Sequence, residues 1–120
     1  MTETAFYILI SFLYNRHGYE TIKYVERITN NRLSIGAGTI YSTISKFERD
    51  GLIACVDRDD RRKIYHVTEL GKCLLQKEVK RIDEMYEITL KIKELIGSEN
   101  KNEKVALMGT VVVQENGSMA

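Results

Sequence analysis

A long stripe of apolar residues with alternating four- and three-residue spacing runs through the last third of the chain. The stripe begins at Leu75 and Val79 and reaches Ile96, which predicts one long helix over residues 70–97. Beyond Val79 such a helix outruns any domain that so short a chain could build around it, so its apolar side chains need another surface. The surface we expect is a second copy of the chain, although packing within one chain remains open.

The start of the chain favours the same conclusion. The run from Thr4 to Tyr14 is apolar almost all round, which suits a helix covered both by its own domain and by a partner. The chain is therefore expected to form a homodimer. The predicted dimer interface consists of Phe6, Ile10, Leu75, Val79, Ile82, Tyr86 and Ile96.

The pattern also predicts two helices and a β-hairpin between these two segments, so that three helices precede the long one. The predicted helices span Thr4–Tyr14, Tyr19–Thr29 and Ala37–Asp50, and the predicted strands span Leu52–Val56 and Ile64–Val67. Ile40, Ile44 and Phe47 recur at helical spacing, and Gly51 stands where a helix commonly ends in the left-handed conformation. The hydroxyl of Thr68 can cap the long helix that follows.

The length of 120 residues and the hydrophobic content of 43% allow one compact domain and an appendage. We expect a domain over residues 1–69, the long helix over 70–97, and a tail over 98–120. The tail begins as a polar, linker-like segment and ends apolar and β-prone. Its role is open between an added strand and disorder.

Several classes of protein are disfavoured by the sequence. No set of nucleophile, base and orienting group is recognisable, and no phosphate-loop or metal-ligand spacing occurs, so we expect neither an enzyme nor a cofactor. Cys55 and Cys73 form no C-x-x-C pair and are expected to act as small hydrophobic residues. The longest apolar run is too short for a membrane span and lacks the features of a signal peptide, which favours a cytoplasmic protein.

Helix, helix, helix, charged hairpin and long helix is the order of a winged helix-turn-helix domain followed by a dimerisation helix. Short motifs in the same order resemble the PadR-like family of transcriptional regulators. They are Phe6-Tyr7-Ile8-Leu9, His17-Gly18-Tyr19, Gly38-Thr39-Ile40-Tyr41, Gly51-Leu52-Ile53, Arg61-Arg62-Lys63-Ile64-Tyr65 and Thr68-Glu69-Leu70-Gly71. The chain lacks the prolines that the family often has before its His-Gly-Tyr and Gly-Thr motifs.

The resemblance implies an α+β, mostly helical fold with a three-helix core, a two-stranded β wing and a long C-terminal dimerisation helix. It also implies binding of double-stranded DNA, with Tyr19 near a phosphate. Some relatives use the dimer cavity for a small effector, for which Tyr7, Met85 and Tyr86 are the candidates here, although core packing is an alternative role for Met85 and Tyr86.

The third helix has the two faces that a DNA-reading helix needs, one to bury and one to offer to phosphates and base edges. Its backbone amides from Gly36 onward suit a phosphate, because the first amides of a helix lack internal partners. The predicted DNA-binding residues of this helix are Gly38, Thr39, Tyr41, Ser42, Ser45 and Lys46. A solvated polar face is the alternative.

The turn of the hairpin is rich in both signs of charge. Its acidic residues gather before the turn and its bases after it, so Arg61, Arg62 and Lys63 are predicted to contact the DNA backbone or minor groove. A solvated turn held by its own ion pairs is the alternative. For His17 a structural role and a phosphate-contact role are equally open.

Together these features predict a homodimeric transcriptional regulator, expected to be a repressor, that binds a palindromic operator and is released by a small aromatic effector. The alternative is a winged-helix module that binds another protein and no DNA, which the net charge of +1 would permit.

Overall fold

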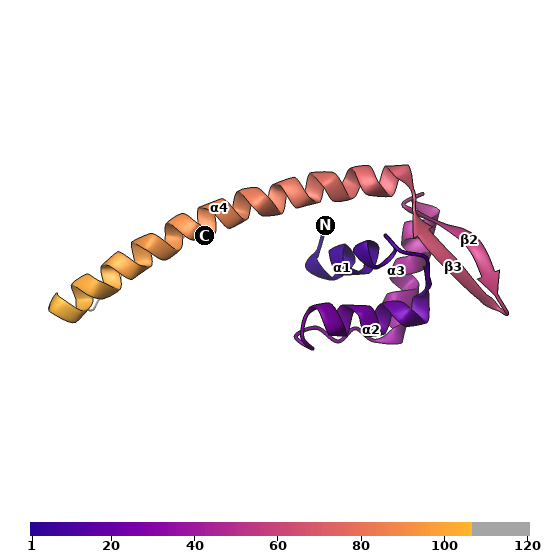
Figure 1. Ribbon diagram of the computed structural model, residues 1–120, viewed down its shortest axis with the longest axis horizontal. Helices are drawn as coiled ribbons and strands as arrows, with labels where there is room; N and C mark the ends of the chain where they lie inside the picture. The colour runs from indigo at the N-terminus through magenta and orange to yellow at the C-terminus, as the bar shows by residue number, and fades with distance from the viewer. Residues whose placement is uncertain (107–120) are drawn as a thin grey trace. The chain divides into compact units, whose positions relative to one another are not determined.

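The computed structural model describes the backbone of residues 1–106 and the side chains of residues 1–98. The chain divides into two compact units, Met1–Lys80 and Arg81–Ala120, which are described separately. In the first unit three helices lie together, and a β-hairpin extends away from them (Figure 1). The predicted apolar end of the tail lies outside the described residues.

The three helices of the first unit are α1 (Glu3–Ser11), α2 (Gly18–Ile28) and α3 (Ala37–Arg49). The hydroxyl of Thr2 caps α1 by accepting a hydrogen bond from the backbone N–H of Ala5 over 3.0 Å. Gly51 follows α3 with φ +79°, as predicted for a residue that ends a helix in the left-handed region. All three predicted helices are therefore confirmed, with shifts of a few residues at their ends.

The sheet has three antiparallel strands in the order β1-β3-β2. β2 (Ile53–Asp59) and β3 (Arg62–Val67) form the predicted hairpin, and they reach further into the charged segment than the sequence suggested. Asp60 turns the chain with φ 61°, a conformation that aspartate tolerates better than most residues. The two-residue strand β1 (Arg16–His17) was not predicted, because so short a strand leaves no pattern of its own.

The core of the first unit is apolar and draws on all three helices and the hairpin. Ile8, Leu9 and Phe12 contribute from the end of α1, and the ring of Phe12 meets Tyr65 edge-on at a centroid distance of 5.8 Å. Leu75 also belongs to this core, with an exposed fraction of only 5%. Its assignment to the dimer interface therefore needs correction, because Leu75 is buried by its own chain.

The last helix, α4 (Glu69–Ala106), begins where Thr68 caps it. The Thr68 hydroxyl accepts a hydrogen bond from the backbone N–H of Gly71 over 3.1 Å, as predicted, and donates one to the carbonyl of Gly51 over 2.6 Å. The helix runs nine residues past the predicted end, so the segment interpreted as a linker is helical up to Ala106. Within the described residues, no helix combines the length and apolar character that crossing a membrane requires.

Both cysteines differ from expectation. Cys55 on β2 and Cys73 on α4 are exposed free thiols and do not fill the core of their own chain.

Candidate nucleic-acid interface

The third helix, α3, separates its apolar and polar residues as predicted. Ile40, Ile44 and Phe47 are buried against the core. The predicted contact residues of α3 all lie on its exposed side: Gly38, Thr39, Tyr41, Ser42, Ser45 and Lys46. A row of exposed polar groups on a rigidly packed helix can meet a second surface without rearrangement of the core.

Two of these side chains already have local partners. The Ser42 hydroxyl donates a hydrogen bond to the carbonyl of Thr39 over 3.1 Å and retains acceptor capacity. The ammonium of Lys46 lies 2.9 Å from the carboxylate of Asp50, one helical turn away. Exposed pairs of this kind contribute little energy, so Lys46 can exchange Asp50 for a phosphate at small cost.

The start of α3 is open to solvent. Gly36 is the N-cap residue, and Gly36 and Gly38 both have free space where a Cβ would stand. Neither glycine has a positive φ, so local backbone geometry does not require them. Open space beside unpaired helix amides is what an approaching phosphate needs.

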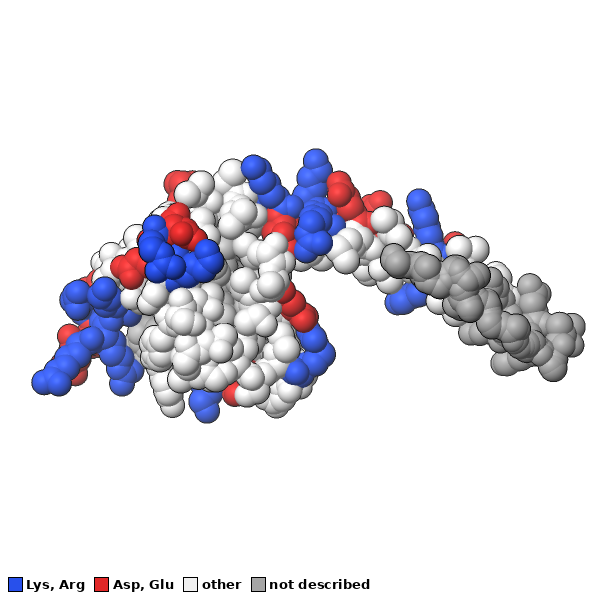
Figure 2. All heavy atoms as spheres, turned by 180° about the vertical axis from the view of Figure 1, so that it is seen from behind, with Lys and Arg blue, Asp and Glu red and all other residues white. Residues whose placement is uncertain are grey.

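The hairpin formed by β2 and β3, which we call the wing, carries a concentration of positive charge. Basic side chains gather at its end, at the left of Figure 2, with acidic atoms between them. In the strand register Arg58 stands directly opposite Lys63. Like charges directly opposite each other destabilise an antiparallel pair, so this arrangement costs stability in the free protein and suits an anionic partner.

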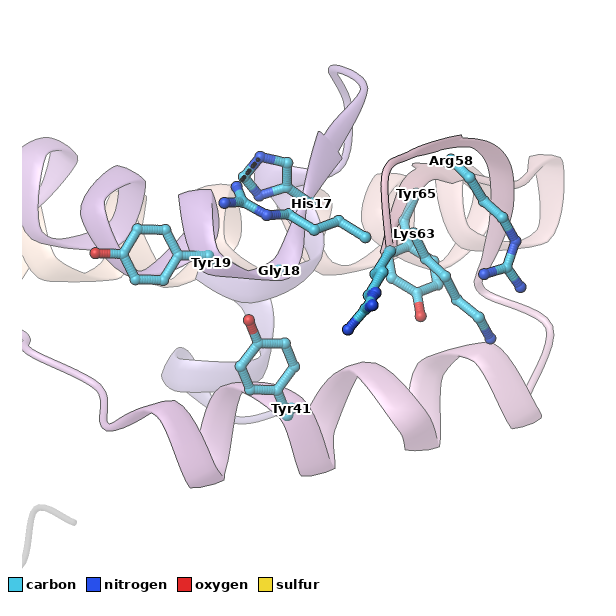
Figure 3. Close-up of a pocket in the computed structure, with 9 residues that line it drawn as sticks. His17, Gly18, Tyr19, Tyr41, Arg58, Lys63 and Tyr65 are labelled. Carbon is cyan, nitrogen blue, oxygen red and sulfur yellow. Dashed lines mark hydrogen bonds between the residues drawn. The ribbon is translucent and has the colours of Figure 1, made fainter.

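A recess of about 510 Å³ joins the wing to α2 and α3. Figure 3 shows Tyr19 and Tyr41 on one side and Arg58, Lys63 and Tyr65 on the other. The full lining is His17, Gly18, Tyr19, Tyr41, Arg58, Arg61, Arg62, Lys63 and Tyr65. It contains four permanent cations and no carboxylate, so the recess favours an anion.

The recess unites only part of the predicted site. It brings Tyr19 and Tyr41 together with the wing residues Arg61, Arg62 and Lys63. The other predicted residues of α3 do not line the recess. Arg58, Gly18 and Tyr65 were not predicted as part of the site. The alternation of acids and bases in the hairpin could have indicated Arg58 only if the strand register had been known.

His17 joins the wing to the start of α2. Arg62 Nη1 lies 3.1 Å from His17 Nε2, drawn as a dashed line in Figure 3. Because a guanidinium can only donate, Nε2 is the acceptor in this contact. The backbone N–H of His17 donates to the carboxylate of Glu20 over 3.0 Å, which fixes the first turn of α2. His17 thus has a structural role at the start of α2 and beside a wing arginine, and its contact with a phosphate stays a prediction.

Glu48 joins the wing to α3. The phenol of Tyr65 donates to Glu48 Oε1 over 3.4 Å, and Lys63 Nζ lies 3.9 Å from Glu48 Oε2. Burial raises the pKa of Tyr65 above its ordinary value, and the negative charge of Glu48 raises it further. Tyr65 therefore stays protonated and holds the wing against the helix that carries the exposed polar row.

The predicted dimer residues are not all equally accessible. On α1, Phe6 and Ile10 are half-buried against the core of their own chain. On α4, Val79, Ile82, Tyr86 and Ile96 are exposed, Tyr86 by 58%. A groove of about 410 Å³ lies beside these first turns of α4 and is lined by Ile10, Leu13, Lys72, Leu75, Gln76 and Val79.

The candidate effector residues come from both units of the chain. Tyr7 is half-buried on α1 with its ring edge-on to Phe6, whereas Met85 and Tyr86 are exposed on α4. An effector site formed by them stays a prediction.

Comparison with known proteins supplies the family. A 78-residue region is 33% identical to an uncharacterised protein of Lysinibacillus sphaericus, covering 62% of this chain and 72% of that one. A transcriptional regulator from Clostridium thermocellum has a similar fold, with a TM-score of 0.63, 21% identity, and coverage of 76% of this chain and 96% of that one. A PadR family transcriptional regulator from Eggerthella lenta gives a TM-score of 0.61, 22% identity, and coverage of 76% and 81%.

The family model described as the transcriptional regulator PadR-like family matches residues 8–77, which is more than half of the chain. The match runs from the end of α1 through α2, α3 and the wing to the start of α4. The winged-helix fold, the exposed face of α3 and the basic recess agree with this assignment. The chain therefore belongs to the PadR-like family, and it is a DNA-binding transcriptional regulator.

Proposed function

We propose that the protein is a homodimeric repressor that binds a palindromic operator through α3 and the wing. The main support is the recess between these elements, whose lining holds Arg58, Arg61, Arg62 and Lys63 and no carboxylate. The total charge of the chain is only +1, so attraction to DNA depends on gathering bases in one place.

In this proposal α3 enters the major groove with its exposed row, while the wing follows the adjacent backbone. Thr39, Ser42 and Ser45 offer short hydroxyl groups to base edges or phosphates. Tyr19 and Tyr41 offer longer phenol groups from the recess. The amides from Gly36 onward receive a phosphate at the helix start.

Dimerisation sets the spacing between the two reading helices. An exposed apolar stripe on α4 packs against a second copy of the chain, which covers a surface that would be unusual on a monomer. The stripe consists of Val79, Ile82, Tyr86 and Ile96. A two-fold dimer that places its two α3 helices about 34 Å apart reads successive major-groove faces of one duplex. Binding at a promoter then blocks transcription, and an aromatic effector near Tyr7, Met85 and Tyr86 alters the spacing and releases DNA.

The test is DNA binding by the whole chain, measured by fluorescence anisotropy on its own upstream DNA over a range of salt concentrations. We expect one palindromic site, and a steep loss of affinity with salt because phosphate contacts release counterions. The double variant Lys46→Ala with Arg62→Ala removes two cations per subunit. The salt slope, which is the slope of the logarithm of affinity against the logarithm of salt concentration, should become shallower by roughly three to four for the dimer, at about 0.9 per phosphate contact.

Lys77→Ala is the matched control, since Lys77 is an exposed cation on α4 outside the recess. It should bind almost as the wild type does. Undiminished binding by the double variant would contradict the assigned residues, and retention of a protein with no retention of DNA would favour the protein-binding alternative. A reporter gene behind the retained site distinguishes repression from activation.

A further inference from the structure

The wing departs from regular strand alternation in a way that changes which charges face α3. In a regular strand every second side chain shares a face. Ile53, Cys55 and Asp57 would then share the face that packs on the core, and Arg58 would point to the opposite side. Regular alternation would therefore direct the carboxylate of Asp57 toward α3.

A β-bulge reverses this arrangement. Cys55 pairs with Tyr65, but the next pair is Asp57 with Ile64, so one extra residue, Val56, is accommodated in β2. Beyond the bulge, each residue of β2 points to the opposite face of the sheet from the one it would have in a regular strand. Arg58 accordingly stands opposite Lys63. Directly opposed residues share a face of the sheet, so Arg58 joins the face that carries Lys63 and Tyr65.

Contacts made by β3 and the lining of the recess agree with this exchange. Lys63 and Tyr65 reach Glu48 of α3, which identifies their face as the one turned toward that helix. Figure 3 shows Arg58, Lys63 and Tyr65 side by side and directed from the wing toward α3. Arg58 lines the recess, whereas Asp57 and Asp59 do not.

The bulge is held by short-range hydrogen bonds. The Cys55 thiol donates to the carbonyl of Asp57 over 3.3 Å, and the Asp57 carboxylate accepts from the backbone N–H of Arg58 over 2.7 Å. Val56, the extra residue, is about half exposed, so its accommodation costs no core packing. Asp57 thus serves the backbone of the bulge and directs its charge away from the recess.

We propose that Arg58 is a phosphate-binding residue of the wing, and that the bulge at Val56 selects it over Asp57 for the DNA-facing side. This inference rests on the proposed function, because it assumes that the recess meets DNA. It explains why the wing binds an anion although its turn mixes both signs of charge. It also explains the unfavourable pairing of Arg58 with Lys63, which a phosphate between the two cations would relieve.

The experiment compares four whole-chain variants in the anisotropy assay, each checked for folding by a thermal melt. Arg58→Ala should weaken binding about tenfold or more, as expected for loss of a charge-assisted contact in each subunit, and lower the salt slope by about two. Arg58→Lys should keep most of the affinity. The exchange variant Asp57→Arg with Arg58→Asp keeps composition and net charge but should bind at least as weakly as Arg58→Ala. Lys77→Ala again is the control.

Equal binding by the wild type and by Arg58→Ala, or by the wild type and a folded exchange variant, would overturn the inference and leave the proposed function standing. Absence of DNA binding by the wild type would overturn both. Should the exchange variant not fold, the contrast between Arg58→Ala and Arg58→Lys decides, because Arg58 is exposed and neither change disturbs the core.

Discussion

Gly71, in the first turn of α4, is the position where a single added methyl group has the clearest structural cost. A Cβ there would stand 2.3 Å from the carbonyl oxygen of Leu52 and 2.5 Å from Val67 Cγ2. The first neighbour is backbone and cannot rotate away. Gly71→Ala should therefore lower the free energy of unfolding by about 2 kcal/mol or more, although alanine is the better helix former. Urea unfolding followed by circular dichroism measures this loss.

Gly97 provides the matched control on the same helix. It has open space where a Cβ would stand, so Gly97→Ala gains helix propensity without a clash and should stabilise α4 by about 0.5–1 kcal/mol. If both variants lost the same free energy of unfolding, the first turn of α4 would not pack against the hairpin.

Tyr65 gives a pH dependence whose sign follows from its raised pKa. The folded chain holds the phenol proton to higher pH than the unfolded chain, because burial and Glu48 disfavour the phenolate. The stability contributed by Tyr65 is thus fully present below the pKa of the phenol in the unfolded chain, about 10, and is lost as the pH rises through its pKa in the folded chain.

Tyr65→Phe removes this titration. We expect the difference in free energy of unfolding between wild type and variant to be constant below about pH 9. Above about pH 10 the wild type should lose stability relative to the variant. Thermal melts of both proteins over that range make the comparison. A constant difference throughout would contradict the buried, Glu48-facing position of the phenol.

At the scale of elements, Thr68 connects the end of α3, the wing and the start of α4. Its hydroxyl accepts from Gly71 in α4 and donates to the carbonyl of Gly51, which follows α3. Thr68→Ala should cost about 1–2 kcal/mol, the usual range for loss of an N-cap. Thr68→Ser keeps the hydroxyl and should retain most of the stability in the same urea titration. A serine variant as unstable as the alanine variant would assign the effect to the methyl group instead.

At the scale of the whole molecule, two positions on α4 separate folding from association. Leu75 is buried in the core of its own chain, so Leu75→Ala should lower the free energy of unfolding by about 2–5 kcal/mol. Ile82 is exposed, so Ile82→Asp should leave the fold of the first unit intact and weaken the proposed dimer.

Sedimentation equilibrium tests the second effect, with Lys77→Gln, which lowers the charge by the same one unit, as the control elsewhere on α4. A wild type that stays monomeric at every concentration would remove the dimer from the proposal. An Ile82→Asp variant that dimerises as the wild type does would place the interface elsewhere.

Much of this architecture could be predicted from the sequence because it depends on local periodicity. Ile40, Ile44 and Phe47 mark the buried face of α3, and Gly51 and Thr68 mark a helix end and a helix start. The ordered motifs also indicated the family. Each of these signals lies within a few residues along the chain, where helix geometry and capping chemistry act directly.

The composition of the recess was decided by tertiary structure. The register of β2 against β3 placed Arg58 beside Lys63 and turned Asp57 away, and the short strand β1 brought His17 to Arg62. Burial of Leu75 likewise depended on which surfaces the hairpin and α1 left to cover it. Strand pairing and core packing join residues that are distant in the sequence, so no local pattern determines them, whereas helix ends and helix faces were determined by the sequence itself.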